Sequence, residues 1–134
     1  MIEGFEGAVG RKSRRVLVHE EAGPRFVEAV VWEQGGTIVS IQRAGDEDLG
    51  LVEDLGDVCL LPGLVDTHVH INEPGRTEWE GFTTATRAAA LGGITTVVDM
   101  PLNCIPVTTT ARALAVKLEA AGPRLWVDLS LIHI

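Results

Sequence analysis

The sequence predicts an α/β fold in which a small β module, residues 1–61, precedes the start of a parallel β/α assembly, residues 62–134. Alternating apolar and polar runs separated by glycine turns fill the first part, which is typical of short antiparallel strands. After Pro62, apolar β-rich runs alternate with helical patterns, and this β-α-β-α-β order is typical of parallel strands joined by helical crossovers.

Three strands are expected in the first part, which we interpret as a small antiparallel β-sandwich module. They are residues 14–20, 26–32 and 37–42. Gly35 and Gly36 lie between two β-rich runs and predict a hairpin turn before the third strand. Residues 43–57 are polar and rich in glycine, and they indicate a loop with at most one short strand.

The second part is expected to contain three strands and two helices. The strands are residues 63–70, 93–100 and 124–132, and the helices are 77–93 and 108–122. The Gly92-Gly93 pair is a C-terminal stop for the first helix, and a threonine caps the second. The apolar stripe of the second helix is expected to be Ala111, Leu114, Leu118 and Ala121.

Right-handed crossovers allow two architectures for these parallel strands, a doubly wound sheet or the start of a (β/α)₈ barrel of the TIM type. No G-x-G-x-x-G string follows the first of them, which removes the main support for a dinucleotide-binding sheet. The Val, Ile and Leu content of the strands is consistent with helices covering them.

Charge and composition exclude several classes of partner. Eleven Lys and Arg against nineteen Asp and Glu give a formal net charge of −8, which disfavours nucleic acid and anionic membrane surfaces. No segment has the ~18 apolar residues of a membrane span, and the N-terminus lacks the apolar core of a signal peptide. Cys59 and Cys104 form no C-x-x-C pair. We therefore expect a cytoplasmic protein with free thiols.

Two of the four histidines, His68 and His70, lie one residue apart at the end of the strand expected at 63–70. Side chains alternate along a strand, so Asp66, His68 and His70 share one face. Residues two apart lie ~6.6 Å apart along a strand, which lets both imidazoles reach one metal ion. An H-x-H pair alone is a weak signal, but three polar groups on one face of an apolar strand favour a shared partner.

Longer strings in this region resemble a known family. They are "PGLVDTHVH", "EPGRTEWEGF" and "GGITTVVDMPLN". Together they resemble the amidohydrolase superfamily and, within it, the cyclic amidase branch of dihydroorotases, dihydropyrimidinases and allantoinases, with the allantoinases most similar. Dihydroorotases typically have an arginine two residues after the second histidine to hold the substrate carboxylate. Asn72 stands at that position here, which favours a hydantoin-ring substrate.

The resemblance implies a pair of zinc ions, with His68 and His70 as ligands of one of them. It also implies a metal-held hydroxide that attacks a ring amide, opening allantoin to allantoate in purine degradation. The family takes a carboxylated lysine, two more histidines and an aspartate proton shuttle from later strands. The lysines and other histidines of this chain do not match those positions; they are Lys12, Lys117, His19 and His133.

We therefore expect no catalytic residue in these 134 residues, weak zinc binding and no activity by the chain alone. A (β/α)₈ barrel takes ~250 residues, so the chain is interpreted as an N-terminal fragment, either a truncated product or an alternative transcript. The partner is expected to be a small cyclic amide, and the parent enzyme a homo-oligomer. Two alternatives remain: a dihydropyrimidinase- or dihydroorotase-like amidase, and a non-catalytic assembly protein of the same branch.

Loop residues supply the remaining candidates. Arg76 and Asn103 follow the first and second parallel strands, where barrel active sites are built, and are candidates for substrate contact. For Arg76, an ion pair with Glu73 or Glu78 is the favoured interpretation.

Two further side chains, Asp66 and Asp99, have a structural interpretation beside the functional one, and two aromatic residues have a structural one alone. Asp66 either orients a ligand histidine or binds backbone. Asp99 has a functional or a helix-capping role. Trp79 and Phe82, three apart in the expected helix, are predicted to be core.

Overall fold

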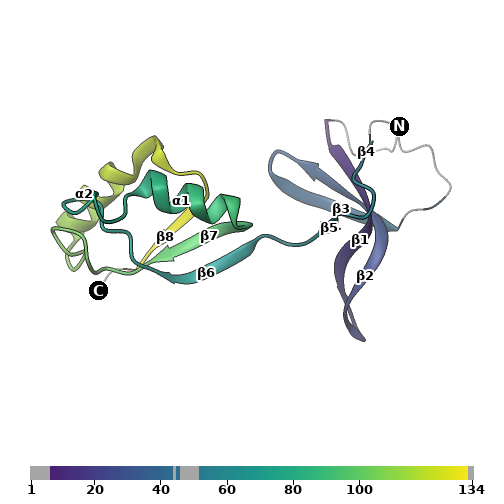
Figure 1. Cartoon of the computed structure of the whole chain (residues 1–134), viewed down its shortest axis with the longest axis horizontal. Helices are drawn as coiled ribbons and strands as arrows, with labels where there is room; N and C mark the ends of the chain where they lie inside the picture. Colours follow the sequence, from purple (N-terminus) through teal and green to yellow (C-terminus); the bar gives the residue numbers. More distant parts are fainter. Residues whose placement is uncertain (1–6, 44, 46–51, 133–134) are drawn as a thin grey trace. The chain divides into compact units, whose positions relative to one another are not determined.

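The computed structural model describes residues 7–43, 45 and 52–132. The chain divides into two compact units, Met1–Pro62 and Gly63–Ile134, and each is described by itself (Figure 1). His133, one of the two histidines outside the expected metal pair, lies outside the described residues. None of the described helices is long and apolar enough to cross a membrane.

The first unit is a single five-stranded sheet. Its strands are β1 (Val9–Glu20), β2 (Gly23–Gln34), β3 (Thr37–Arg43), β4 (Val52–Asp54) and β5 (Cys59–Leu60). The order is β3-β2-β1-β4, with β5 also pairing with β1. The antiparallel pairing of the first three strands agrees with the sequence, but β4 and β5 run parallel to β1. The described strands therefore form one mixed sheet in place of the expected antiparallel sandwich, because the chain returns from β3 to the other edge of β1.

Strand β1 starts earlier than its apolar pattern indicates and contains an irregularity between Ser13 and Val16. The Ser13 hydroxyl is fully buried there, donating to the Val58 carbonyl at 2.5 Å and accepting from the Arg15 amide at 2.9 Å. These bonds satisfy backbone groups that the irregular register leaves out of the ladder. Val16 and Trp32 are among the buried core residues of this sheet.

The second unit is a three-stranded parallel sheet with two helices. Its elements are β6 (Leu64–Val69), α1 (Phe82–Leu91), β7 (Ile94–Asp99), α2 (Ala111–Ala121), the short 3₁₀ helix η1 (Gly122–Arg124) and β8 (Asp128–Leu131). The strand order is β6-β7-β8, all parallel, and both helices lie on the same side of the sheet (Figure 1). Successive right-handed crossovers in one direction produce this arrangement.

The hydrophobic core of this unit is built around Ile71, Phe82 and Ala121, which come from the loop after β6, the start of α1 and the end of α2. Partly buried apolar side chains pack against them: Val69, Ala85, Ala120, Leu125 and Leu129. Phe82 is fully buried, which confirms its predicted place in the core.

The prediction for Trp79 is wrong, because its side chain is 65% exposed. Helix α1 begins at Phe82 rather than at residue 77, so the spacing from Trp79 is not helical. Residues 77–79 form a turn, in which the Trp79 amide donates to the Arg76 carbonyl at 3.0 Å. Trp79 therefore lies in the loop before α1, and its side chain is not on the buried face of a helix.

Helix α2 has the predicted threonine cap, with the Thr110 hydroxyl accepting the Ala113 amide at 3.1 Å, but it begins at Ala111 and not at residue 108. Of the predicted apolar stripe, Ala121 is buried but Leu118 is 53% exposed. The buried residues of the helix are Ala113, Lys117 and Ala121. The three buried positions are four residues apart and share one face. Because one of these positions is a lysine, the spacing of apolar residues does not predict this face as the buried one.

Candidate metal-binding strand and the loops around it

His68 and His70 converge at the carboxyl end of β6. Their Nε2 atoms lie 3.2 Å apart, and the ring centroids are 5.1 Å apart. Two nitrogens each ~2.05 Å from one tetrahedral metal ion are ~3.3 Å apart. The two imidazoles therefore fit two corners of one such ion, and without an ion the same distance allows a hydrogen bond between the rings.

Asp66 lies on the same strand, and its Oδ1 accepts the backbone amide of His68 at 3.1 Å. Of the two interpretations expected for Asp66, this contact is the one with the backbone. The carboxylate therefore stabilises the end of the strand and does not orient an imidazole. Within the described residues, no group of three or more His, Cys, Asp or Glu side chains is placed to hold a metal ion. The two imidazoles alone would leave the other coordination positions of a metal ion to further ligands or water.

A buried ion pair binds the backbone of Ile71, the residue that follows His70. Asp99, at the end of β7, and Lys117, in α2, are 0% and 1% exposed, and the ammonium contacts the carboxylate. Asp99 Oδ1 accepts the Ile71 amide at 2.7 Å, while Lys117 Nζ donates to the Ile71 carbonyl at 3.4 Å and lies 3.4 Å from Cys104 Sγ. Burial raises the pKa of the Asp99 carboxyl, against the Ile71 amide and the Lys117 ammonium, which lower it.

Sequence reasoning missed this pair, because it considered Lys117 only as a match to the family's metal-bridging lysine and assigned it no partner. The signal that could have found it is its spacing of four residues from both Ala113 and Ala121. A lysine on a buried helix face needs an anionic partner. Asp99, which ends the neighbouring strand, is the one that the structure supplies.

Arg76 and Asn103 meet in the loops that follow β6 and β7. The Arg76 guanidinium donates to the Asn103 carbonyl at 3.3 Å and lies 4.9 Å from the centre of the Trp79 ring. The expected ion pair of Arg76 with Glu73 or Glu78 is not present among the described residues. The Glu73 side chain is buried instead.

Glu73 joins two distant parts of the second unit. Its side chain is 8% exposed, contacts the Arg124 guanidinium, and accepts the Phe82 amide at 2.9 Å. It therefore satisfies a free amide at the start of α1 and pairs with η1. Next to it, Asn72 is buried and its Oδ1 has no hydrogen-bond partner within the described residues.

Gly75 joins the same two loops. Its φ is +89°, and a Cβ placed there would lie 2.7 Å from Ile105 Cβ and 2.8 Å from the Ile105 carbonyl oxygen. The Ile105 amide donates to the Pro74 carbonyl at 2.8 Å, so the backbones are already in contact. Only glycine fits this approach.

We expect Gly75→Ala to lower the free energy of unfolding of the second unit by more than the ~1 kcal/mol of left-handed strain alone. Gly93→Ala is the matched control, because Gly93 has φ +80° and open space around the added Cβ. Urea unfolding followed by circular dichroism at 222 nm, a signal to which only the helical unit contributes strongly, measures both. Equal losses for the two variants would show that the contact with Ile105 is unimportant.

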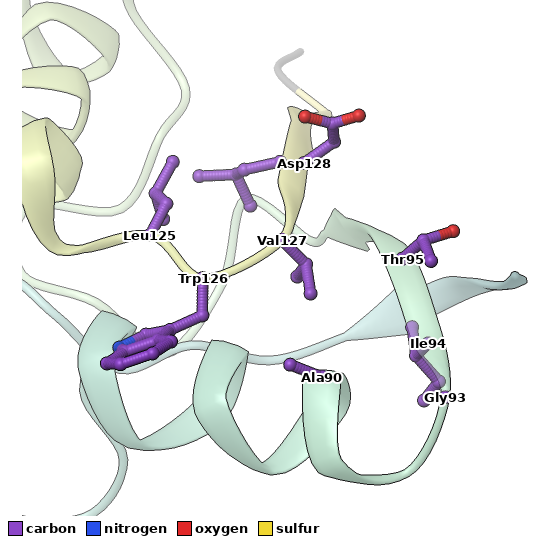
Figure 2. Close-up of a pocket in the computed structure, with 9 residues that line it drawn as sticks. Ala90, Gly93, Ile94, Thr95, Leu125, Trp126, Val127 and Asp128 are labelled. Atoms are coloured by element: carbon purple, nitrogen blue, oxygen red, sulfur yellow. The ribbon is translucent and has the colours of Figure 1, made fainter. Parts of the chain in front are cut away.

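Of two hollows in the second unit, one is lined by His70 and the other lies away from both histidines. One of about 700 Å³ is lined by residues at the amino ends of β7 and β8, including Ile94, Trp126 and Asp128, and by the end of α1 (Figure 2). A smaller one of about 380 Å³ lies between β6 and α1 and includes Asp66 and His70. The histidines occupy the carboxyl end of the strands, so the larger hollow lies at the opposite end of the sheet.

Comparison with known proteins relates this geometry to a family. The sequence is 65% identical to the allantoinase of Streptomyces avermitilis over 119 residues, covering 88% of this chain and 26% of that protein. It is 50% identical over 121 residues to a probable allantoinase of Oryza sativa subsp. japonica, covering 87% of this chain and 23% of the relative. The chain thus spans about a quarter of the length of these relatives.

Solved structures agree with the fold. The L-hydantoinase (dihydropyrimidinase) from Arthrobacter aurescens superposes with a TM-score of 0.73 at 32% identity, over 92% of this chain and 27% of that one. The dihydropyrimidinase from Brevibacillus agri gives 0.71 at 25% identity, over 94% and 27%. Residues 59–132 match the model of the amidohydrolase family, whose members are generally metal-dependent. That match covers β5 to β8 and more than half of the length of the chain. The chain therefore belongs to the amidohydrolase family.

Proposed function

We propose that the chain is the N-terminal part of an allantoinase, a zinc hydrolase that opens the hydantoin ring of allantoin to allantoate. The observation that carries the proposal is the convergence of His68 and His70, with Nε2 atoms 3.2 Å apart at the carboxyl end of β6. The identity of 65% with a bacterial allantoinase supports the choice of substrate.

In this proposal, residues 1–61 are a separate β module and residues 62–134 are the first three strands and two helices of a (β/α)₈ barrel. The sequential order β6-β7-β8 with both helices on one side of the sheet supports a barrel over a doubly wound sheet, whose helices cover both faces. A barrel also places its chemistry at the carboxyl ends of the strands, where the two histidines lie.

His68 and His70 would hold one zinc ion, which when bound lowers the pKa of its water toward ~7 and polarises the carbonyl it contacts. The chain's own residues would position the metal ligands and the substrate. Asp66 accepts the His68 amide, and Arg76 and Asn103 lie in the loops where substrate would enter. No proton-transfer residue is assigned within the described chain. Hydrolysis therefore depends on groups from the rest of a longer protein.

The neighbouring amidases of the branch are the second candidate. Dihydroorotate carries a carboxylate, and the neutral Asn72 has no charge with which to pair it. The buried Asn72 Oδ1 needs a hydrogen-bond donor, and the ring amides of allantoin and of dihydrouracil can supply one. A comparison of allantoin, dihydrouracil and dihydroorotate as substrates separates the three.

The test is a chimera in which this chain replaces the matched 119-residue part of the Streptomyces avermitilis allantoinase. We expect zinc-loaded chimera to hydrolyse allantoin in preference to the other two substrates. His70→Ala should reduce kcat/KM at least ~10³-fold, because one ligand of the ion is lost. His19→Ala, which removes a histidine of β1, is the matched control and should leave the rate unchanged.

Three results would argue against the proposal. A folded, zinc-containing chimera that opens dihydrouracil faster than allantoin would favour a dihydropyrimidinase. Unchanged activity in His68→Ala and His70→Ala would remove the metal role. A chimera that turns over none of the substrates, together with tight binding of the 134-residue chain to an intact subunit, would favour the non-catalytic assembly protein.

A further inference from the structure

The backbone on both sides of His70 is held by hydrogen bonds from other elements. The peptide before it presents the Val69 carbonyl to the Met100 amide at 2.9 Å, and the peptide after it presents the Ile71 amide to Asp99 Oδ1 at 2.7 Å. Because peptide groups are planar, fixing these two planes fixes φ and ψ of His70. The direction in which its side chain leaves the strand follows from them.

Lys117 binds the carbonyl of the following peptide group, and it also contacts Asp99, whose carboxylate accepts the Ile71 amide. Its ammonium donates to the Ile71 carbonyl at 3.4 Å and contacts the carboxylate of Asp99. Both polar atoms of the Ile71 backbone are therefore bound by one buried ion pair. The pair joins α2, the end of β7 and the end of β6 at a single point.

The position of the pair is unusual for a purely structural contact. Ion pairs buried in a core are costly to form and add little stability over apolar packing. This one lies one residue beyond a metal-binding candidate, and its polar contacts beyond the pair include both backbone groups of Ile71. Ile71 itself is 1% exposed, so water does not replace these bonds.

We propose that Lys117 is a positioning residue for the metal-binding pair. It holds Asp99 on the Ile71 amide, binds the Ile71 carbonyl, and so directs the His70 imidazole toward His68. The inference rests on the proposed function, in which His70 holds a metal ion, but it concerns the orientation of the ring and can be measured without metal.

The test compares Lys117→Met with wild type in the full chain. Isothermal titration with Co²⁺ measures affinity, and ¹³C relaxation of the imidazole carbons measures the order of the His70 ring without metal. We expect Co²⁺ to bind ~10–100-fold more weakly, the usual effect of removing a group that orients a ligand, and the His70 ring to become less ordered. If the single variant does not fold, Asp99→Asn in the Lys117→Met background removes both charges and should show the same direction of change.

Thr86→Val is the matched control. Its buried hydroxyl bonds the Phe82 carbonyl at 2.6 Å and the Trp126 amide at 3.2 Å, away from the histidines. It should be destabilising, yet change Co²⁺ affinity less than twofold. Equal changes in affinity for the Lys117 variants and Thr86→Val would overturn the positioning role.

The two proposals fail in distinguishable ways. Wild-type chain that does not bind Co²⁺, with an ordered His70 ring, would count against the metal site. In that case the relaxation experiment alone decides the inference, since ring order that is unchanged in the Lys117 variants would refute it. Loss of ring order only in those variants would support it.

Discussion

Phe82→Ala is expected to lower the free energy of unfolding of the second unit by about 3–5 kcal/mol, enough to unfold much of it. The ring is fully buried between Ile71 and Ala121, so truncation leaves a cavity in the centre of the core. The same residue begins α1, where Glu73 binds its amide, and a core that collapses would loosen that end of the helix.

Trp79→Ala is the comparison, because it removes a larger ring only three residues away. Its side chain is 65% exposed and contacts the Arg76 guanidinium, a contact between an exposed cation and a ring worth about 0.5–1 kcal/mol. Urea unfolding at 222 nm should therefore show a small shift for Trp79→Ala and a large one for Phe82→Ala. Similar shifts would mean that α1 begins earlier and buries Trp79.

Lys117→Met should cost about 3–5 kcal/mol of stability at pH 7, because it leaves the Asp99 carboxylate buried without its cation. Adding Asp99→Asn should recover most of this loss, since the amide oxygen can still accept the Ile71 amide while no charge remains. The double-mutant cycle, measured by urea unfolding, gives the coupling between the two side chains. Additive losses would show that they do not interact.

The loss in Lys117→Met should also depend on pH in a defined direction. Burial raises the pKa of Asp99, and removing the ammonium removes a group that lowers it. A carboxyl whose pKa is higher in the folded chain than in the unfolded one costs stability once the pH exceeds its ordinary value of ~3.9. The difference between wild type and Lys117→Met should be largest near pH 7 and shrink toward pH 4. A difference independent of pH would show that Asp99 is neutral in both.

Local rules explain what the sequence could predict. The alternation along residues 63–70 places His68 and His70 on one face, and their Nε2 atoms do converge. Thr110 and the Gly92-Gly93 pair mark helix ends through contacts with residues a few positions away. Such helix ends can therefore be predicted from the local sequence.

The errors share a different cause, which is contact between residues far apart in sequence. Glu73 pairs with Arg124, 51 residues away, so it was not available to Arg76. Lys117 binds the backbone 46 residues before it. Because one sequence carries no information on which distant groups meet, the burial of Lys117 against Asp99 was not predicted.

The outer position of β6 in its sheet gives the histidines a further property. Any parallel strand that added to that edge would bring its own carboxyl end beside His68, where its side chains could add ligands to the proposed metal site. Strand docking and ion capture would then be thermodynamically linked, each raising the affinity for the other by the same factor. Zinc bound there would strengthen the docking of such a strand, and a chelator would weaken it.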